Sequence, residues 1–402
     1  MVRGLFLWLS LAVSILMLPP LRNTALRAEE PAKGSYAAWK NGPPARDDFF
    51  PVAVWLQQPA NAPKFKAAGI NLYVGLWDGP TDKQLADLKK HGMPVICSQN
   101  AAGLAHQDNS IIVGWMHGDE PDNAQSLGRG KGYGPPILPA KIVADYRRLR
   151  ERDPSRPVLL NLGQGVAWDG WYGRGTRTGK PEDYPEYLKG CDIASFDIYP
   201  ACHSHPDVAG KLWFVADGVS RLRKWSDDKK PVWTCIECTH IDNEKAKATP
   251  EQVRAEVWMA LVRGSRGLIY FVHQFKPTVI EAGLLADPQM LAKVTETNQQ
   301  IQQLAPVLNS PSVQGGVAVK TSAPDVPVET IVKRHGGATY IFAVAMRPGQ
   351  TDAEFRVTGL SGRATAEVLG EARTIDIENG AFREKFAEWE VHLYRIADAN
   401  PK

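Results

Sequence analysis

The chain has 402 residues, of which 44% are hydrophobic and 23% charged. This composition is that of an ordinary globular protein and excludes a disordered, collagen-like or coiled-coil chain. At about 150 residues per domain, the length predicts two or three domains, or one large barrel with an addition. Five cysteines are too few for a disulfide scaffold, and the formal net charge of +3 suggests at most an acidic partner.

Residues 1–28 have the pattern of a secretory signal peptide. Arg3 gives a basic start, Leu5 to Leu21 is nearly continuously apolar, and the segment ends in the small residue Ala28. The alternative, an uncleaved membrane anchor, is disfavoured because the apolar run is short for a span of roughly 20 residues and contains two prolines. We therefore expect an exported protein, periplasmic or extracellular, without stable membrane insertion after removal of the signal.

The positive charge lies entirely in this segment. It contains three arginines and no acidic residue, so the remaining chain has as many basic as acidic residues. Neutralising phosphates requires a clustered basic face, and no such run is present. The sequence therefore predicts no nucleic-acid partner.

After an N-terminal arm at 29–48, strand and helix patterns alternate. Apolar strand patterns occur at 52–56, 71–76, 94–98, 111–116, 157–161, 192–199, 231–236 and 267–272. Helical patterns separate them at 61–69, 81–91, 140–152, within 207–226, at 250–262 and at 287–304. Eight such units predict a (β/α)₈ TIM barrel over 49–308. The rival is an open doubly wound sheet, whose commonest signature, GxGxxG after the first strand, is missing.

The pattern changes in the last 94 residues, 309–402. Short strands follow one another with little helix between them, and His335-Gly336-Gly337 and Asn379-Gly380 are typical of hairpin turns. We expect a small C-terminal β-sandwich domain here.

Two strand ends carry glutamate. In a barrel, chemistry lies at the carboxyl ends of the strands, and only the fourth and seventh predicted strands end in glutamate, Glu120 in HGDEP and Glu237 in IECTH. Glycosidic bond cleavage uses two carboxyl groups, one that protonates the leaving oxygen and one that attacks C1 or activates water. Taken singly, the DEP triplet is also typical of a helix start, and Glu237 could be an ion-pair partner.

On these residues the sequence resembles the clan A glycoside hydrolases, which have a (β/α)₈ barrel and cleave with retention. The resemblance covers residues 50–305 and implies that Glu120 is the acid/base and Glu237 the nucleophile. It also implies that Tyr199 in DIYP holds the nucleophile, although Tyr199 could equally be a packing residue. Asp119 stands where the clan usually has Asn, and no particular family of the clan is assigned.

Further residues at predicted strand ends and in long loops are candidate carbohydrate-binding groups. Aromatic faces suit the C–H-rich faces of sugar rings, and at least one of the four tryptophans is expected to be core. Histidines at such positions are also common as structural residues. The candidates are Asp119, His117, Asn161, Asp197, Tyr199, His240 and Gln274, with Trp55, Trp77, Trp168 and Trp171 for stacking.

Two other functions remain open: a barrel that binds carbohydrate without catalysis, and an inverting hydrolase that uses Asp119 or Asp197. No metal or cofactor is expected, because the CxxC at Cys235–Cys238 has no second ligand pair. The glycine-rich stretch 128–134 lacks the GxxxxGK[ST] pattern of a phosphate loop. Cys202 and Cys238 follow the ends of neighbouring strands and could form a disulfide.

Overall fold

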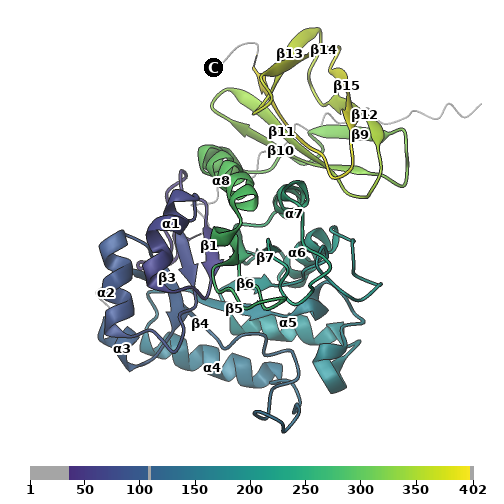
Figure 1. Cartoon of the computed structure of the whole chain (residues 1–402). Coiled ribbons are helices and arrows are strands. Elements are labelled where there is room, and N and C mark those ends of the chain that lie inside the picture. Colours follow the sequence, from purple (N-terminus) through teal and green to yellow (C-terminus); the bar gives the residue numbers. More distant parts are fainter. Residues whose placement is uncertain (1–35, 107–109, 399–402) are drawn as a thin grey trace, which may run out of the picture.

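The computed structural model describes residues 36–106 and 110–398. The predicted signal peptide, 1–28, lies outside these residues. The chain forms two parts, a barrel and a C-terminal β-domain, with α7 (Pro250–Val262) and α8 (Pro288–Gln303) between them (Figure 1). Among the described residues, no helix is long and apolar enough to cross a membrane.

Eight parallel strands close into the predicted barrel. Their order is β6-β5-β4-β3-β2-β1-β8-β7, and a parallel bridge between Ala194 and Val232 joins β6 to β7. The strands are β1 (Val52–Trp55), β2 (Leu72–Val74), β3 (Val95–Ser98), β4 (Ile112–Met116), β5 (Val158–Leu162), β6 (Ile193–Phe196), β7 (Trp233–Glu237) and β8 (Gly267–Phe271). The (β/α)₈ prediction is confirmed.

Helices cover the outside of the barrel. Besides α7 and α8 they are α1 (Ala62–Ala67), α2 (Asp82–His91), α3 (Ala101–Ala105), α4 (Pro139–Arg152), α5 (Tyr184–Tyr187), α6 (Phe214–Trp225) and α9 (Ala305–Asn309). Local sequence determines their ends. Thr81 and Gln84 form a capping box at the start of α2, and Gly92 ends it in the left-handed conformation.

The arm before β1 closes the amino-terminal end of the barrel. Tyr36 is buried in the same cluster as Trp233 and the other side chains that point into the barrel. The Trp233 indole N–H donates to the Tyr36 hydroxyl at 2.8 Å, and that hydroxyl donates to the Arg266 carbonyl at 2.9 Å. The arm is thus part of the barrel core.

The C-terminal part is one continuous antiparallel sheet in the order β10-β11-β16-β13-β14-β15-β12-β9. Phe355 of β12 lies 5.5 Å from Tyr394 of β16, which is not its neighbour in the sheet, so the sheet folds over on its own core. The expected small β-domain is confirmed, and Ala381–Phe386 adds a strand that was not expected. The strands are β9 (Val317–Thr321), β10 (Val328–His335), β11 (Ala338–Ala345), β12 (Thr351–Val357), β13 (Arg363–Val368), β14 (Arg373–Glu378), β15 (Ala381–Phe386) and β16 (Val391–Ala397).

The two parts share one hydrophobic core. Helix α7 is almost wholly buried, and Trp258 on it packs against Phe342 of β11 with ring centroids 5.1 Å apart. A second contact stacks the Arg347 guanidinium over the Trp213 ring at 3.9 Å, and Trp213 also stacks with Trp389. Because these groups are desolvated together, the β-domain is fixed on the barrel.

Replacing Tyr36 with Phe should destabilise the fold without touching the opposite, carboxyl end of the barrel. The substitution leaves the buried Trp233 N–H without an acceptor, which costs about 1–3 kcal/mol. Urea unfolding of Tyr36→Phe against wild type measures this loss. Tyr133→Phe, at a tyrosine that is 75% exposed, is the control and should unfold like wild type; equal stability of both variants would contradict the assignment.

Candidate active site

Three carboxyl groups converge at the carboxyl ends of β4, β5 and β6. The Asn161 side-chain N–H₂ donates to Asp119 Oδ1 at 2.9 Å and to Asp197 Oδ2 at 3.1 Å. The hydroxyl of Ser195 donates to Asn161 Oδ1 at 2.8 Å and so fixes the orientation of the amide. Asn161 of β5 therefore holds two carboxyl groups, one from each of the flanking strands β4 and β6, around one nitrogen atom.

Glu120 completes this group. Its backbone is in the left-handed region, with φ of 42°, which is unusual for a residue with a side chain and is common at functional sites. Its carboxyl group is hydrogen-bonded to that of Asp197. Its Oε1 also approaches Gly163 so closely that a Cβ there would lie 2.9 Å away. A side chain at 163 would therefore displace the ends of the Glu120 and Asn123 side chains.

Burial, and after it the charges of neighbouring acids, raises the pKa values of these three groups. Burial, and then the charge of Asp119, raises the pKa of Glu120 to about 7. Burial raises the pKa of Asp119 to about 6. Burial together with the charge of Glu120 raises the pKa of Asp197 well above its usual range, so Asp197 holds the proton of the pair that it forms with Glu120.

Access to solvent differs among the three groups. The surrounding residues desolvate the carboxyl groups of Asp119 and Glu120, but Asp119 is an exposed residue at the mouth and Glu120 is partly exposed, whereas Asp197 is buried. A molecule that enters the mouth therefore meets Asp119 and Glu120 first. Asp197 and Asn161 lie behind them and set their positions and protonation.

Glu237 is in a different environment. Its side chain is fully buried, and its two oxygens accept hydrogen bonds from the backbone N–H groups of Ala201 at 2.6 Å and Cys202 at 2.8 Å. On its other side lies the fully buried Glu256 of α7, whose pKa is raised well above its usual range by burial and then by the charge of Glu237. Glu237 thus fastens the loop after β6 to the end of β7.

Two rings lie across the end of β7. Tyr199 follows β6, Phe271 ends β8, and their ring centroids are 5.1 Å apart, although β7 lies between these strands. Burial, and then the charge of Asp197, raises the pKa of Tyr199, whose hydroxyl neighbours the Cys235 thiol. The structure therefore brings Asn161, Asp197 and Tyr199 to the pair Asp119 and Glu120, and it places Glu237 in a separate, covered contact.

Three polar candidates from the sequence hold loops or helices. The ring of His117 is buried and bonds the Gly190 carbonyl at 2.8 Å, on the outer side of the barrel, so the expected binding role is corrected to a structural one. His240 Nδ1 bonds the carbonyl of Asn243 at 3.0 Å within the loop after β7. Gln274 donates to the Thr278 carbonyl at 3.3 Å within the loop after β8.

The four tryptophan candidates divide by exposure. Trp55 is buried in the barrel core, so it is corrected from a stacking residue to a core residue. Trp168 is also buried in a hydrophobic core, so it too is corrected from a stacking residue to a core residue. Trp171 is partly buried and donates to Asn123 Oδ1 at 2.8 Å. Trp77 is 42% exposed at the mouth.

A buried acid next to Glu120 was missed by the sequence analysis. Asp122 is fully buried and accepts hydrogen bonds from the Gly163 N–H at 2.9 Å and the Tyr184 hydroxyl at 3.1 Å. It joins the loop after β4 to the loop after β5 and thereby seats Gly163 beside Glu120. The sequence feature that could have identified Asp122 is its position two residues after Glu120, in DEPD.

The cysteines are free thiols. All five are buried and unpaired, so the hypothesised disulfide between Cys202 and Cys238 is not formed. Cys202 lies against Glu237, and the Cys238 thiol donates to the Phe271 carbonyl at 3.4 Å. Within 36–106 and 110–398, no cluster of three or more His, Cys, Asp or Glu side chains is arranged to hold a metal ion.

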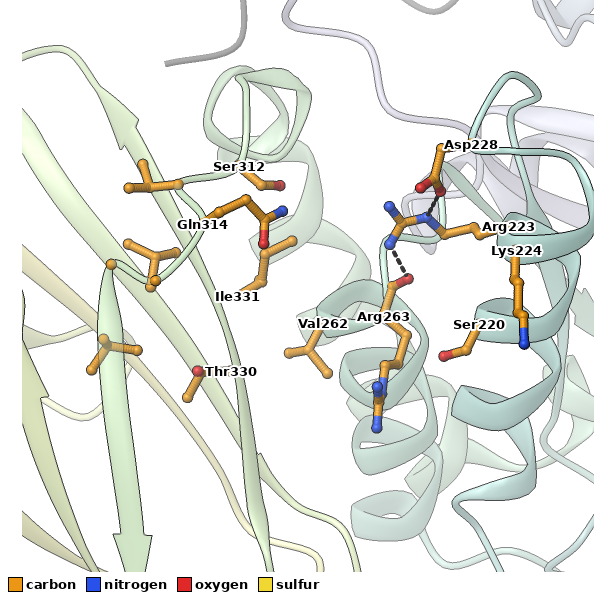
Figure 2. Close-up of a pocket in the computed structure, with 15 residues that line it drawn as sticks. Ser220, Arg223, Lys224, Asp228, Val262, Arg263, Ser312, Gln314, Thr330 and Ile331 are labelled. Carbon is orange, nitrogen blue, oxygen red and sulfur yellow. Dashed lines mark hydrogen bonds and ion pairs between the residues drawn. The ribbon is translucent and has the colours of Figure 1, made fainter. Parts of the chain in front are cut away.

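A separate cavity of about 520 Å³ lies at the junction of the two parts. Figure 2 shows Gln314, Thr330 and Ile331 on one side and Arg223 and Arg263 on the other. Arg223 is already bound to the Asp228 carboxylate at 2.7 Å and to the Arg263 carbonyl at 2.8 Å. The cavity is far in the fold from the strand ends, and its lining has no group of acids like that around Glu120.

Comparisons with known proteins establish the fold. No family model and no curated protein matches the chain. A crystal structure of an AmyP variant in complex with maltotriose is 10% identical, with a TM-score of 0.52, over 88% of this chain and 98% of that one. A putative α-galactosidase/melibiase from Bacteroides fragilis is 9% identical, with a TM-score of 0.51, over 87% of this chain and 79% of that one. The fold is shared with glycoside hydrolase structures. No family within them is assigned.

Glu120→Gln should stabilise the protein more at pH 8 than at pH 5. A carboxyl group whose pKa is raised to about 7 contributes stability below its ordinary pKa, and this contribution is lost as pH rises through 7. The difference in unfolding temperature between variant and wild type measures the effect at both pH values. Glu151→Gln, on an exposed part of α4, controls for the loss of one charge; a difference that does not grow with pH would contradict the raised pKa.

Proposed function

We propose that the protein is an exported glycoside hydrolase that acts on a poly- or oligosaccharide, with Glu120 as the proton donor. The observation that carries the proposal is the placement of Glu120: it is accessible from the barrel mouth, and its pKa of about 7 lets it donate a proton near neutral pH. The shared fold with glycoside hydrolase structures supports it. Export rests on the sequence of residues 1–28.

The sequence and the geometry favour different residues as the second catalytic carboxyl group. The resemblance to clan A predicts double displacement with Glu237 as nucleophile. As placed, both Glu237 oxygens are bound to backbone N–H groups and its side chain has no exposed surface. Asp119 is exposed beside Glu120, and its pKa is about 6. The geometry therefore supports the other alternative, in which Asp119 activates water.

In this arrangement each group has one task. Glu120 gives its proton to the glycosidic oxygen as the bond from that oxygen to C1 breaks. Asp119 takes a proton from a water molecule as the water oxygen bonds to C1. Inversion requires this water to reach the face opposite the leaving oxygen, with about 6.5–9.5 Å between the Asp119 and Glu120 carboxyl groups. Asn161 holds Asp119 in place, and Asp197, which bonds Glu120, keeps that carboxyl group oriented. Asp119 then releases its proton to solvent, and Glu120 takes one up from solvent.

Glu120→Gln should reduce hydrolysis about 10²–10⁴-fold, the usual contribution of a general acid. Glu237→Gln should reduce it less, because Glu237 fastens a loop and does not touch the reacting atoms. Both variants are assayed with wild type on a polysaccharide panel, with thermal unfolding as the control for folding. Equal, measurable hydrolysis by wild type and Glu120→Gln would refute the proton donor, whereas binding without any hydrolysis by wild type would leave a carbohydrate-binding barrel.

The anomeric configuration of the first product, followed by proton NMR, decides the second carboxyl group. Inversion is expected with Asp119 as base. Retention, together with loss of activity in Glu237→Gln as large as that in Glu120→Gln, would restore Glu237 as the nucleophile.

The activity should depend on pH as a narrow bell. Asp119 must be ionised, so the acidic limb lies near pH 6, and Glu120 must be protonated, so the alkaline limb lies near pH 7. Asp119→Asn removes the charge that helps to raise the Glu120 pKa, so the alkaline limb of its residual activity should move to lower pH. An alkaline limb at the same pH in wild type and Asp119→Asn would show that the charge of Asp119 does not raise the pKa of Glu120.

A further inference from the structure

Trp77 is held as a flat platform at the rim of the barrel mouth. Its indole N–H donates to Glu281 Oε1 at 3.1 Å, and the same oxygen accepts the Gln58 N–H at 2.9 Å. One face of the ring stacks on His273, with centroids 5.7 Å apart and planes 15° from parallel. With 42% of the residue exposed, the other face is open to solvent in a fixed orientation.

Phe275 enlarges the same apolar wall. It is 45% exposed and lies 6.2 Å from both His273 and Phe271. Its loop is rigid, because Gln274 and Ile280 exchange two backbone hydrogen bonds of 2.9 Å. From Phe271 the wall continues to Tyr199, beside the carboxyl groups. Burial lowers the pKa of His273 to about 4, so the wall is uncharged at the pH at which Glu120 would work.

A second aromatic platform stands on the opposite rim. Tyr172, in the loop between β5 and β6, is 64% exposed and lies 4.8 Å from Trp171. Tyr172 follows β5, and its ring lies 6.3 Å from that of His205 in the loop after β6. In the closed order of eight strands, β5 and β6 are opposed to β1 and β2. Trp77 follows β2 and is linked through Glu281 to Gln58 after β1, so it faces this loop across the mouth. Asp119 and Glu120, at the end of β4, project between the two rims.

We infer that the mouth binds an extended stretch of glycan, with sugar rings stacked on Trp77 and Phe275 at one rim and on Tyr172 at the other, so that cleavage occurs within the chain. The inference rests on the proposed function and assigns its substrate class, a polysaccharide rather than a disaccharide. Fixed aromatic faces bind the apolar faces of sugar rings with little loss of side-chain entropy. Two such faces on opposite sides of Glu120 require a ligand that continues past the scissile bond in both directions.

Binding is tested in the Glu120→Gln background, which separates it from hydrolysis. Retardation in native gels that contain starch, xylan, mixed-linkage β-glucan or galactomannan identifies a polysaccharide, and calorimetry with its oligosaccharides of two to six units gives affinities. Adding Trp77→Ala or Tyr172→Ala should each weaken binding of the longer oligosaccharides about tenfold, equivalent to about 1.4 kcal/mol. Trp77→Phe, which keeps an aromatic face, should recover part of the loss.

Tyr133→Ala, at a tyrosine exposed on the glycine-rich loop after β4, is the matched control and should bind like the parent. Affinity should rise with chain length beyond two units, and wild type should reduce the viscosity of the polysaccharide before many reducing ends appear. Retardation by none of the four polysaccharides would overturn the inference, as would Trp77→Ala and Tyr172→Ala variants that bind like Tyr133→Ala. Binding that depends on Trp77 but is not accompanied by hydrolysis would support glycan binding at the barrel mouth and refute the proposed catalysis.

Discussion

The site depends on one amide group. Asn161 offers a single nitrogen to Asp119 and Asp197, which follow β4 and β6, the strands on either side of its own. This shared donor links the acceptor oxygens of the two side chains. The barrel supplies the constraint, since closure of the strands forces their carboxyl ends into one small ring. The ordering of protonation among Asp119, Glu120 and Asp197 follows from this enforced proximity.

The loops behind the site keep Glu120 in an unfavourable backbone conformation. Asp122 fixes the Gly163 N–H, and the missing side chain at Gly163 leaves room for the Glu120 carboxyl group. The backbone conformation of Glu120 is therefore supported both by residues close in sequence, whose N–H groups bond its carbonyl, and by the contact with the loop after β5. Such support makes the orientation of the carboxyl group independent of any ligand.

Much of the fold could be predicted from the sequence, because strand and helix periodicities are local signals. Thr81 and Gly92 bound α2 as expected, and apolar runs marked all eight barrel strands. Glu120 could be found by its position after β4. The environment of Glu237 could not, because it is set by the backbone of Ala201 and Cys202, about 35 positions away, and by Glu256 on α7. Position after a strand does not show which groups a carboxylate meets.

The tryptophans illustrate the same limit. Trp55 ends β1, and Trp77 follows the end of β2. Trp55 packs in the barrel core, whereas Trp77 stacks on His273. What separates them is the partner Glu281, contributed by a loop some two hundred residues further along.

The burial of helix α7 determines whether the barrel can be separated from the β-domain. An outer barrel helix normally keeps a polar face for water, but α7 presents Glu256 inward to β7 and Trp258 outward to β11, and it is buried on both sides. The β-domain therefore covers the outward face of α7, which solvent would otherwise contact. A barrel cut out at the end of α9 would expose an apolar strip, so the two parts form one inseparable unit, and exchange of the β-domain for another would require α7 to change with it.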